Sequence, residues 1–277
     1  MECYYSNLID NKIPDNCKIF HCENQRLSVL PELPISLIEL KCCNNKLREL
    51  PELPITLKCL DCGWNLLDKL PNLPNGLINL SCYANNITEL PNLPVNLEII
   101  CYNFCKLVNS PIYSDKLTKL SCRGNNLQLL PELPVLLKKL DCVNCNLSEL
   151  PLLPSTLRTL ECDKNNIVKL PELPDTLILL SCYENKIIEL PKLPKNIANL
   201  YCNDNNIKYL SYHNIQVIKQ QFGVKIINMS INDFDRYKDY LNYLDEIDIT
   251  NNPFSIEYRG RINDNWNWNF LEAINKL

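Results

Sequence analysis

The apolar residues of the chain recur with a period of 20 from about residue 17 to residue 210. The repeating unit is LxxLxCxxNxLxxLPxLPxx, as at residues 37–54 and again at 157–174. A repeat of this length is typical of solenoids, in which each copy forms one coil and buries its apolar face against its neighbours. The pattern therefore predicts about ten stacked coils.

Within each copy, the segment LxxLxC alternates between apolar and variable positions, which predicts a short strand with its Leu and Cys side chains pointing inward. The asparagine that follows carries donors and an acceptor, so it can satisfy backbone groups where the strand turns into a loop. Cys105 and Cys145 replace this asparagine in two copies.

The proline pairs, such as Pro51 and Pro54, fix φ and remove backbone donors. They exclude a helix on the return side of the coil and favour an extended, polyproline-like path. The first eleven positions also match the leucine-rich-repeat pattern. We therefore expect an α/β-type solenoid that is mostly β, with short parallel strands on the concave face of a gently curved, thin rod.

The repeat divides the chain into three parts. Residues 1–16 form a degenerate first coil or cap, residues 17–210 form about ten repeats, and residues 211–277 form a longer terminal repeat and a C-terminal cap with a helix over 233–243. The copy at 97–116 is irregular, because Tyr102 occupies the Cys position and Ser114 replaces a proline. Its length is unchanged, so we expect a local distortion and not a domain boundary.

Composition excludes several classes of function. Neither phosphate-binding glycine motif occurs, and the only two histidines, His21 and His213, lie at opposite ends of the chain, which disfavours Ser/Cys–His catalysis and a His-rich metal site. A net charge of −4 disfavours a nucleic-acid partner. No targeting segment or membrane-spanning apolar run is visible, so we expect an intracellular, cytoplasmic protein.

Sixteen cysteines could indicate disulfides, but nine of them hold one inward column and suit the role of small buried hydrophobes. Stacked neighbours in that column run parallel, which suits disulfide geometry poorly. The pairs Cys59/Cys62 and Cys142/Cys145 have the spacing of a metal half-site, yet the repeat columns explain Cys142 and Cys145. Cys43 and Cys59 point outward without a basic neighbour, so we expect no catalytic thiol, metal or cofactor.

The outward positions of the strand face differ from copy to copy while the inward positions do not, as in a scaffold that presents a specific surface. Aromatic residues and arginine anchor protein interfaces, although scattered exposed aromatics are also common on surfaces without partners. The candidate partner-binding residues are Trp64, Tyr83, Phe104, Arg123, Tyr183 and Tyr201.

The LPxLPxxLxxLxxxxNxL copies resemble the 20-residue leucine-rich repeats of secreted bacterial effectors of the YopM and IpaH type. The Cys-for-Leu version in an Asn-, Ile- and Lys-rich chain also resembles leucine-rich repeat proteins of giant amoeba viruses. The resemblance implies protein–protein interaction in a host or infected cell. IpaH-type relatives add a ubiquitin-ligase domain with a catalytic Cys, but no Cys follows Cys202, so that activity is not carried over.

The expected function is thus a non-catalytic module that holds a protein partner on its strand face. The first alternative is a structural or virion-packaged repeat protein without a specific partner, and the second is a thiol-dependent enzyme. The oligomeric state is left open.

Overall fold

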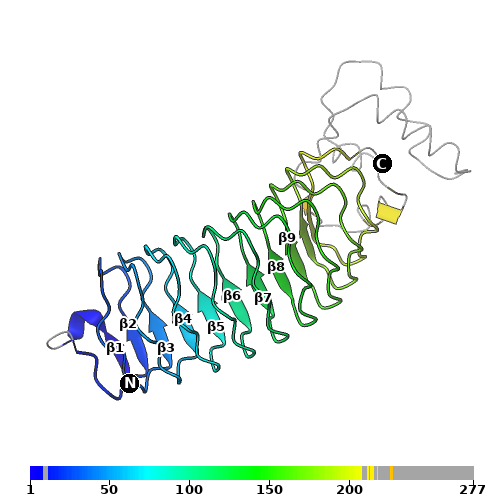
Figure 1. Ribbon diagram of the computed structural model, residues 1–277. Coiled ribbons are helices and arrows are strands. Elements are labelled where there is room, and N and C mark those ends of the chain that lie inside the picture. Colours follow the sequence, from blue (N-terminus) through cyan, green and yellow to red (C-terminus); the bar gives the residue numbers. More distant parts are fainter. Residues whose placement is uncertain (9–11, 208–210, 212, 215–216, 218–224, 227–277) are drawn as a thin grey trace, which may run out of the picture.

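A computed structural model describes residues 1–8, 12–207, 211, 213–214, 217 and 225–226. The described strands form one parallel sheet in which spatial order follows chain order (Figure 1). Their bounds are β1 Glu2–Tyr4, β2 Ile19–His21, β3 Glu39–Lys41, β4 Cys59–Asp61, β5 Asn79–Ser81, β6 Ile99–Cys101, β7 Lys119–Ser121, β8 Lys139–Asp141, β9 Thr159–Glu161, β10 Leu179–Ser181, β11 Asn199–Tyr201 and β12 Lys225–Ile226, with a 3-10 helix η1 at Tyr5–Asn7.

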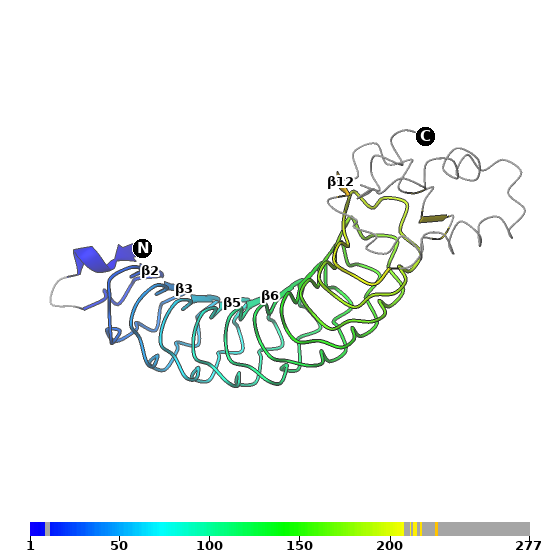
Figure 2. The same cartoon turned by 90° about the horizontal axis from the view of Figure 1, so that it is seen from above.

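The 20-residue repeat sets the register of the sheet. Leu40 pairs with Leu60, and between neighbouring strands from β2 to β11 each residue pairs with the residue 20 positions further along the chain. Figure 2 shows the strands on the inner side of a gentle arc, with the connecting segments on the outer side. The predicted class of fold, a curved parallel solenoid of about ten turns, is confirmed.

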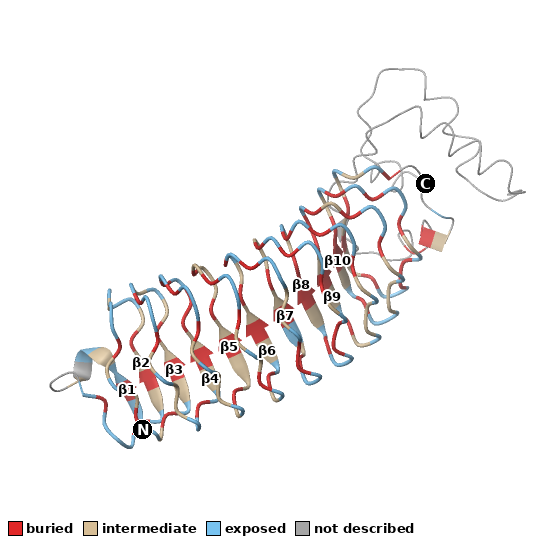
Figure 3. Ribbon diagram, in the orientation of Figure 1, coloured by how far each residue is buried: buried red, intermediate tan, exposed pale blue. Residues whose placement is uncertain are grey.

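The alternation in sequence becomes alternation in burial. The middle residue of each strand from β2 to β11 is buried, and its two neighbours in most strands are partly exposed. Stacked coils thereby build one continuous core, drawn as the red stripe in Figure 3. The inward cysteine that follows each strand belongs to it; Cys42, Cys62 and Cys142 have no exposed surface. Thiols in these positions pack as small apolar groups.

A column of asparagines ties each coil to the one before it. The amide oxygen of Asn165 accepts N–H groups of Cys145 and Leu147 at 3.0 and 2.9 Å. Its nitrogen donates to the carbonyl oxygens of Cys142, Cys162 and Asp163. One buried side chain thus satisfies five backbone groups of two coils, as the repeat pattern predicted.

The return side of the coils is extended, as the proline pairs predicted. Residues 12–207 contain no helix, and each connecting segment closes with one tight turn, such as the bond from Leu57 N–H to the carbonyl of Pro54 at 3.0 Å. The prolines cannot donate to a helix, so the segment stays narrow and adds little width to the outer side of the arc.

The irregular copy keeps its place in the sheet. β6 pairs in register with β5 and β7. Tyr102 is fully buried, and its hydroxyl lies 2.8 Å from that of Tyr113, which occupies a leucine position of the repeat. Two large side chains that share a hydrogen bond therefore fill the space of a thiol and a leucine without a change of register.

The sheet continues past the last repeat. β12 pairs with β11, a strand that the repeat pattern did not predict. Before it, the buried Asn214 accepts the N–H of Leu193 at 2.8 Å and donates to Pro191 at 3.0 Å. The helix expected over 233–243 and the rest of the expected C-terminal cap lie outside the described residues. No helix among the described residues is long and apolar enough to cross a bilayer.

Candidate interaction surface

The inner side of the arc presents three outward positions per coil, namely the two residues that flank the middle of the strand and the residue after the cysteine. Because the strands are stacked without offset, equivalent positions of neighbouring coils lie side by side. This strand face is continuous along the rod and carries the residues that vary most between copies.

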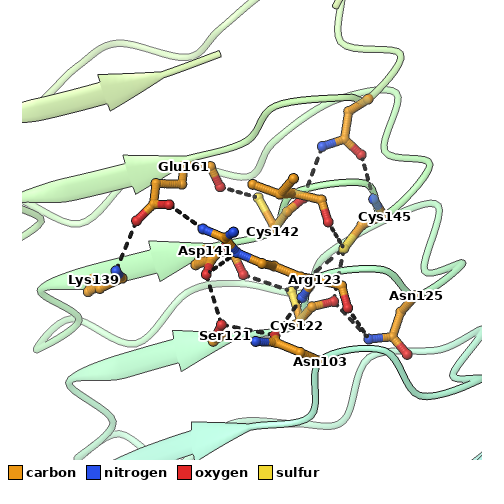
Figure 4. A network of polar contacts seen from close by, with 12 residues as sticks. Asn103, Ser121, Cys122, Arg123, Asn125, Lys139, Asp141, Cys142, Cys145 and Glu161 are labelled. Carbon is orange, nitrogen blue, oxygen red and sulfur yellow. Dashed lines mark hydrogen bonds and ion pairs between the residues drawn. The ribbon is translucent and has the colours of Figure 1, made fainter. Parts of the chain in front are cut away.

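Arg123 is the centre of an ion network on the strand face (Figure 4). Its Nε lies 2.5 Å from Oδ2 of Asp141 on the next coil, and its Nη2 contacts Glu161 one coil further. Lys139 pairs with the other oxygen of Glu161 at 2.9 Å, and Ser121 donates to Asp141 at 2.9 Å. Arg123 therefore fastens three coils together, and a partner would meet a guanidinium whose charge is already balanced.

Asp163 lies beside this network and is buried, with 4% of its surface exposed. It accepts the Ser181 hydroxyl at 2.6 Å and the N–H of Tyr183 at 3.0 Å. Burial raises the pKa of Asp163 to about 6, because desolvation outweighs the two hydrogen bonds that favour the carboxylate.

Two of the candidate aromatic residues, Trp64 and Phe104, project into solvent from the turn after their strands, with 61% and 59% of their surfaces exposed. Both have positive φ, at 50° and 52°, but so do the residues at the same place in other coils. This backbone conformation therefore belongs to the repeat and does not mark a strained site.

Two glycines make room for aromatic rings. A Cβ on Gly63 would lie 2.1 Å from a ring carbon of Tyr83, and one on Gly124 would lie 2.4 Å from a ring carbon of Phe104. Tyr83 thus leans on the coil before it and Phe104 on the coil after it, so the two rings point apart.

The other two candidate aromatics lie further along the rod. The ring of Tyr183 has the ammonium of Lys164 5.8 Å from its centre, at the outer limit of a cation–π contact. Tyr201 is on β11 and is partly exposed. The structure therefore places Trp64, Tyr83 and Phe104 in one region of the strand face and Tyr183 with Tyr201 in another, with the Arg123 network between them.

A shallow hollow of about 130 Å³ lies on the strand face over β3 to β6. Its charged lining residues are all on β3 and β4, namely Glu39, Lys41 and Asp61. The outward lining residues without charge are Cys59, Asn79, Ser81, Ile99 and Cys101. Of these residues the sequence singled out only Cys59, as an outward thiol, and none of them as a partner-binding residue. An uncharged run in the outward columns of two neighbouring copies is the signal that could have found them.

The outward thiols are poor nucleophiles. Burial, with the negative charge of Asp61, raises the pKa of Cys43 to about 11, and burial also raises the pKa values of Cys59 and Cys101. All three are therefore protonated near neutral pH, which is unfavourable for thiolate chemistry. In the part of the chain that the structure describes, no three His, Cys, Asp or Glu side chains are grouped as metal ligands would be.

Short parallel strands, an inward asparagine column and a narrow return segment define this chain as a leucine-rich-repeat protein. No protein-family model matches the sequence, and no curated protein matches it.

Solved structures do match. YopM from Yersinia enterocolitica WA-314 is 32% identical with a TM-score of 0.62; the match covers 72% of this chain and 49% of that one. YopM from Yersinia pestis, described as a leucine-rich effector protein, is 27% identical with a TM-score of 0.57 over 72% of this chain and 75% of its own. This chain thus resembles YopM, while spanning about half the length of the first of these structures.

A third structure is the functional domain of InlJ from Listeria monocytogenes, which is 26% identical with a TM-score of 0.59 over 64% of this chain and 44% of its own. It is described as including a cysteine ladder.

Proposed function

We propose that this protein is a non-catalytic protein-interaction module and that its partner docks on the strand face from β3 to β7. The observation that carries the proposal is the contrast between the coils' inside and outside. Inward positions repeat the same Leu, Cys and Asn, whereas outward positions change, form a hollow over β3 to β6, and include the exposed rings of Trp64 and Phe104 on the coils of β4 and β6. Aromatic residues are enriched at protein–protein interfaces.

The resemblance to YopM supports an effector-like role, in which the partner is a host protein. The likeness to repeat proteins of giant amoeba viruses, and with it a location in the host cytoplasm, stays a prediction from the Cys-for-Leu repeat. The protonated outward thiols favour a binding role over a catalytic one.

The test is photo-crosslinking from a designed position on the strand face. The full chain carrying a photoreactive amino acid at Tyr83 is added to host lysate, irradiated and purified, and the captured protein is identified and then titrated as a purified species. We expect Trp64→Ala with Phe104→Ala to weaken binding of that species by roughly 30-fold, about 2 kcal/mol.

Leu152→Ala is the matched control, because Leu152 is 84% exposed but lies between two prolines of a return segment. It should bind like the parent protein. Equal binding by the double variant would reject the chosen face, and no specific capture from any strand-face position would favour the alternative of a structural repeat protein.

A further inference from the structure

The two copies that replace the ladder asparagine by cysteine each create a contact between two thiols. The sulfur of Cys145 lies 3.9 Å from that of Cys122, which is 23 positions earlier and belongs to the preceding coil (Figure 4). Cys105 is placed in the same way relative to Cys82: its thiol donates to the Cys82 carbonyl oxygen at 3.4 Å, as the Cys145 thiol does to the Cys122 carbonyl oxygen at 3.0 Å. The repeat therefore produces the same pair twice, two coils apart.

These contacts differ from those of the other inward cysteines. The thiols of Cys22, Cys62 and Cys142 donate to the carbonyl oxygens of Lys41, Ser81 and Glu161 in the following coil, at 3.4–3.5 Å. Cys122 makes the same contact, to the carbonyl oxygen of Asp141 at 3.5 Å, in addition to its contact with Cys145. A second cysteine at the asparagine position brings two side chains of the cysteine columns together, and near the start of the chain Cys17 also has a side-chain hydrogen bond with Cys3.

The asparagine position also supplies groups that stabilise a thiolate. In a regular coil the asparagine oxygen accepts two backbone N–H groups. When cysteine occupies the position, its hydrogen bond with the Cys122 side chain, followed by those with the backbone of Asn125 and Gly124, lowers the pKa of Cys145. In the reduced protein the Cys145 thiol is the donor to the Cys122 sulfur. The pKa of Cys105 is lowered in the same way by Cys82. Each pair thus contains one thiol suited to attack an oxidant and a second thiol placed to form a disulfide with it.

We propose that Cys122–Cys145 and Cys82–Cys105 are modification sites at which a small hydroperoxide forms disulfides between neighbouring coils. The Cys145 thiolate attacks the terminal oxygen of the hydroperoxide, the O–O bond breaks, and Cys145 becomes a sulfenic acid. The other oxygen leaves as an alkoxide, or as hydroxide when the oxidant is hydrogen peroxide, and takes up the proton that the Cys145 thiol lost. The Cys122 sulfur then attacks the sulfenic sulfur, the S–O bond breaks, and the sulfenic hydroxyl leaves as water with the proton of the Cys122 thiol. Overall, two thiols and one hydroperoxide give one disulfide, one water and the alcohol, or a second water when the oxidant is hydrogen peroxide.

Short rotations complete the bond. The sulfur atoms must approach from 3.9 Å to about 2 Å, which two cysteine side chains can share by turning about χ1. Both pairs are buried, so oxidant reaches them through local opening of the coils and the reaction is slow. Because Cys122 directly precedes Arg123, the new bond would fasten the coil of Arg123 to that of Asp141 beneath the strand face.

The experiment oxidises the full, folded chain with hydrogen peroxide, alkylates the remaining thiols in denaturant and maps the unreduced peptides by mass spectrometry. We expect two dominant bridged peptides, Cys122–Cys145 and Cys82–Cys105, ahead of any bridge between stacked column neighbours such as Cys142 and Cys162. We also expect the urea midpoint of the oxidised protein to rise and to return to its starting value on treatment with dithiothreitol.

The repeat itself provides the control variants. Cys145→Asn and Cys105→Asn restore the ladder residue, so each should fold and lose only its own bridge, and the double variant should lose the reversible rise in urea midpoint. Bridges scattered along the column, bridges formed only after unfolding, or free Cys122 and Cys145 after the outward thiols have been oxidised would each overturn the proposal.

Discussion

The Arg123 guanidinium and the Asp141 carboxylate, from neighbouring coils, meet with Nε at 2.6 and 2.5 Å from the two carboxylate oxygens. Asp141 is 4% exposed, so loss of its cationic partner would destabilise the protein more than loss of the partner of a surface carboxylate. The contact joins neighbouring coils, so residues of the strand face contribute to the stability of the protein as well as to any binding of a partner. Residues chosen there as binding candidates must therefore be tested for stability as well as for affinity.

Replacing Arg123 by methionine should destabilise the protein by about 2 kcal/mol, because it leaves the Asp141 carboxylate buried without a cation. The value lies below that for a fully buried pair, since a third of the Arg123 side chain is exposed. Urea unfolding measures the change. Asp141→Asn in the same background should recover part of the loss; an additive further loss would show that the pair is not the cause.

Truncating the ladder asparagine Asn165 to alanine should cost about 3 kcal/mol, because five hydrogen bonds to buried backbone disappear at once. Its neighbour Asn166 donates one exposed hydrogen bond to Asn146 and provides the control, at about 0.5 kcal/mol or less. Comparable urea midpoints for the two variants would contradict the role assigned to the ladder.

Asp163 should make stability depend on pH. Its pKa is raised from an ordinary value of 3.8 to about 6, so between these values the folded state binds the proton more tightly than the unfolded state does. Stability therefore falls as pH rises from about 4 to about 6, by an amount on the order of 1–2 kcal/mol.

Asp163→Asn keeps an oxygen for Ser181 and Tyr183 and removes the titration. The unfolding free energy of this variant should no longer decrease between pH 4 and 6. Urea titrations at several pH values measure it. A variant with the same pH profile as the parent protein would place the responsible group elsewhere.

Tyr102 offers a test of how the irregular copy is packed. Tyr102→Cys restores the repeat residue but should destabilise by about 3 kcal/mol, because it opens a cavity and leaves the Tyr113 hydroxyl without its 2.8 Å partner. Tyr102→Phe keeps the ring volume and should cost about 1 kcal/mol. Thermal unfolding of the two variants measures both changes in stability. If Tyr102→Cys were as stable as the parent protein, the adjacent coils would have to close the cavity.

Much of the fold could be predicted because the same 20-residue pattern occurs in about ten consecutive copies. The inward Leu, Cys and Asn positions, the short strands and the extended return side all follow from one 20-residue pattern. The strand β12 could not be predicted this way, since Lys225 and Ile226 lie outside the pattern and join the sheet by pairing with β11.

The candidate site was predicted less completely, because its residues are outward ones that obey no repeat. Trp64 and Phe104 could be named as exposed aromatics from their columns, but the lean of Tyr83 over Gly63 depends on a missing Cβ in the preceding coil. The hollow over β3 to β6 is formed by side chains of four strands together, and a single copy contains no sign of it.

The sequence by itself determined the period, the inward columns and hence the solenoid, because burial in a stacked coil depends only on position within the repeat. The tertiary structure alone decided which outward groups pair, that Arg123 reaches two coils and that Cys145 meets Cys122 and not Cys142. These contacts join residues about 20 or 40 positions apart, and side-chain length and direction at the coil boundary, which no periodicity encodes, select between them.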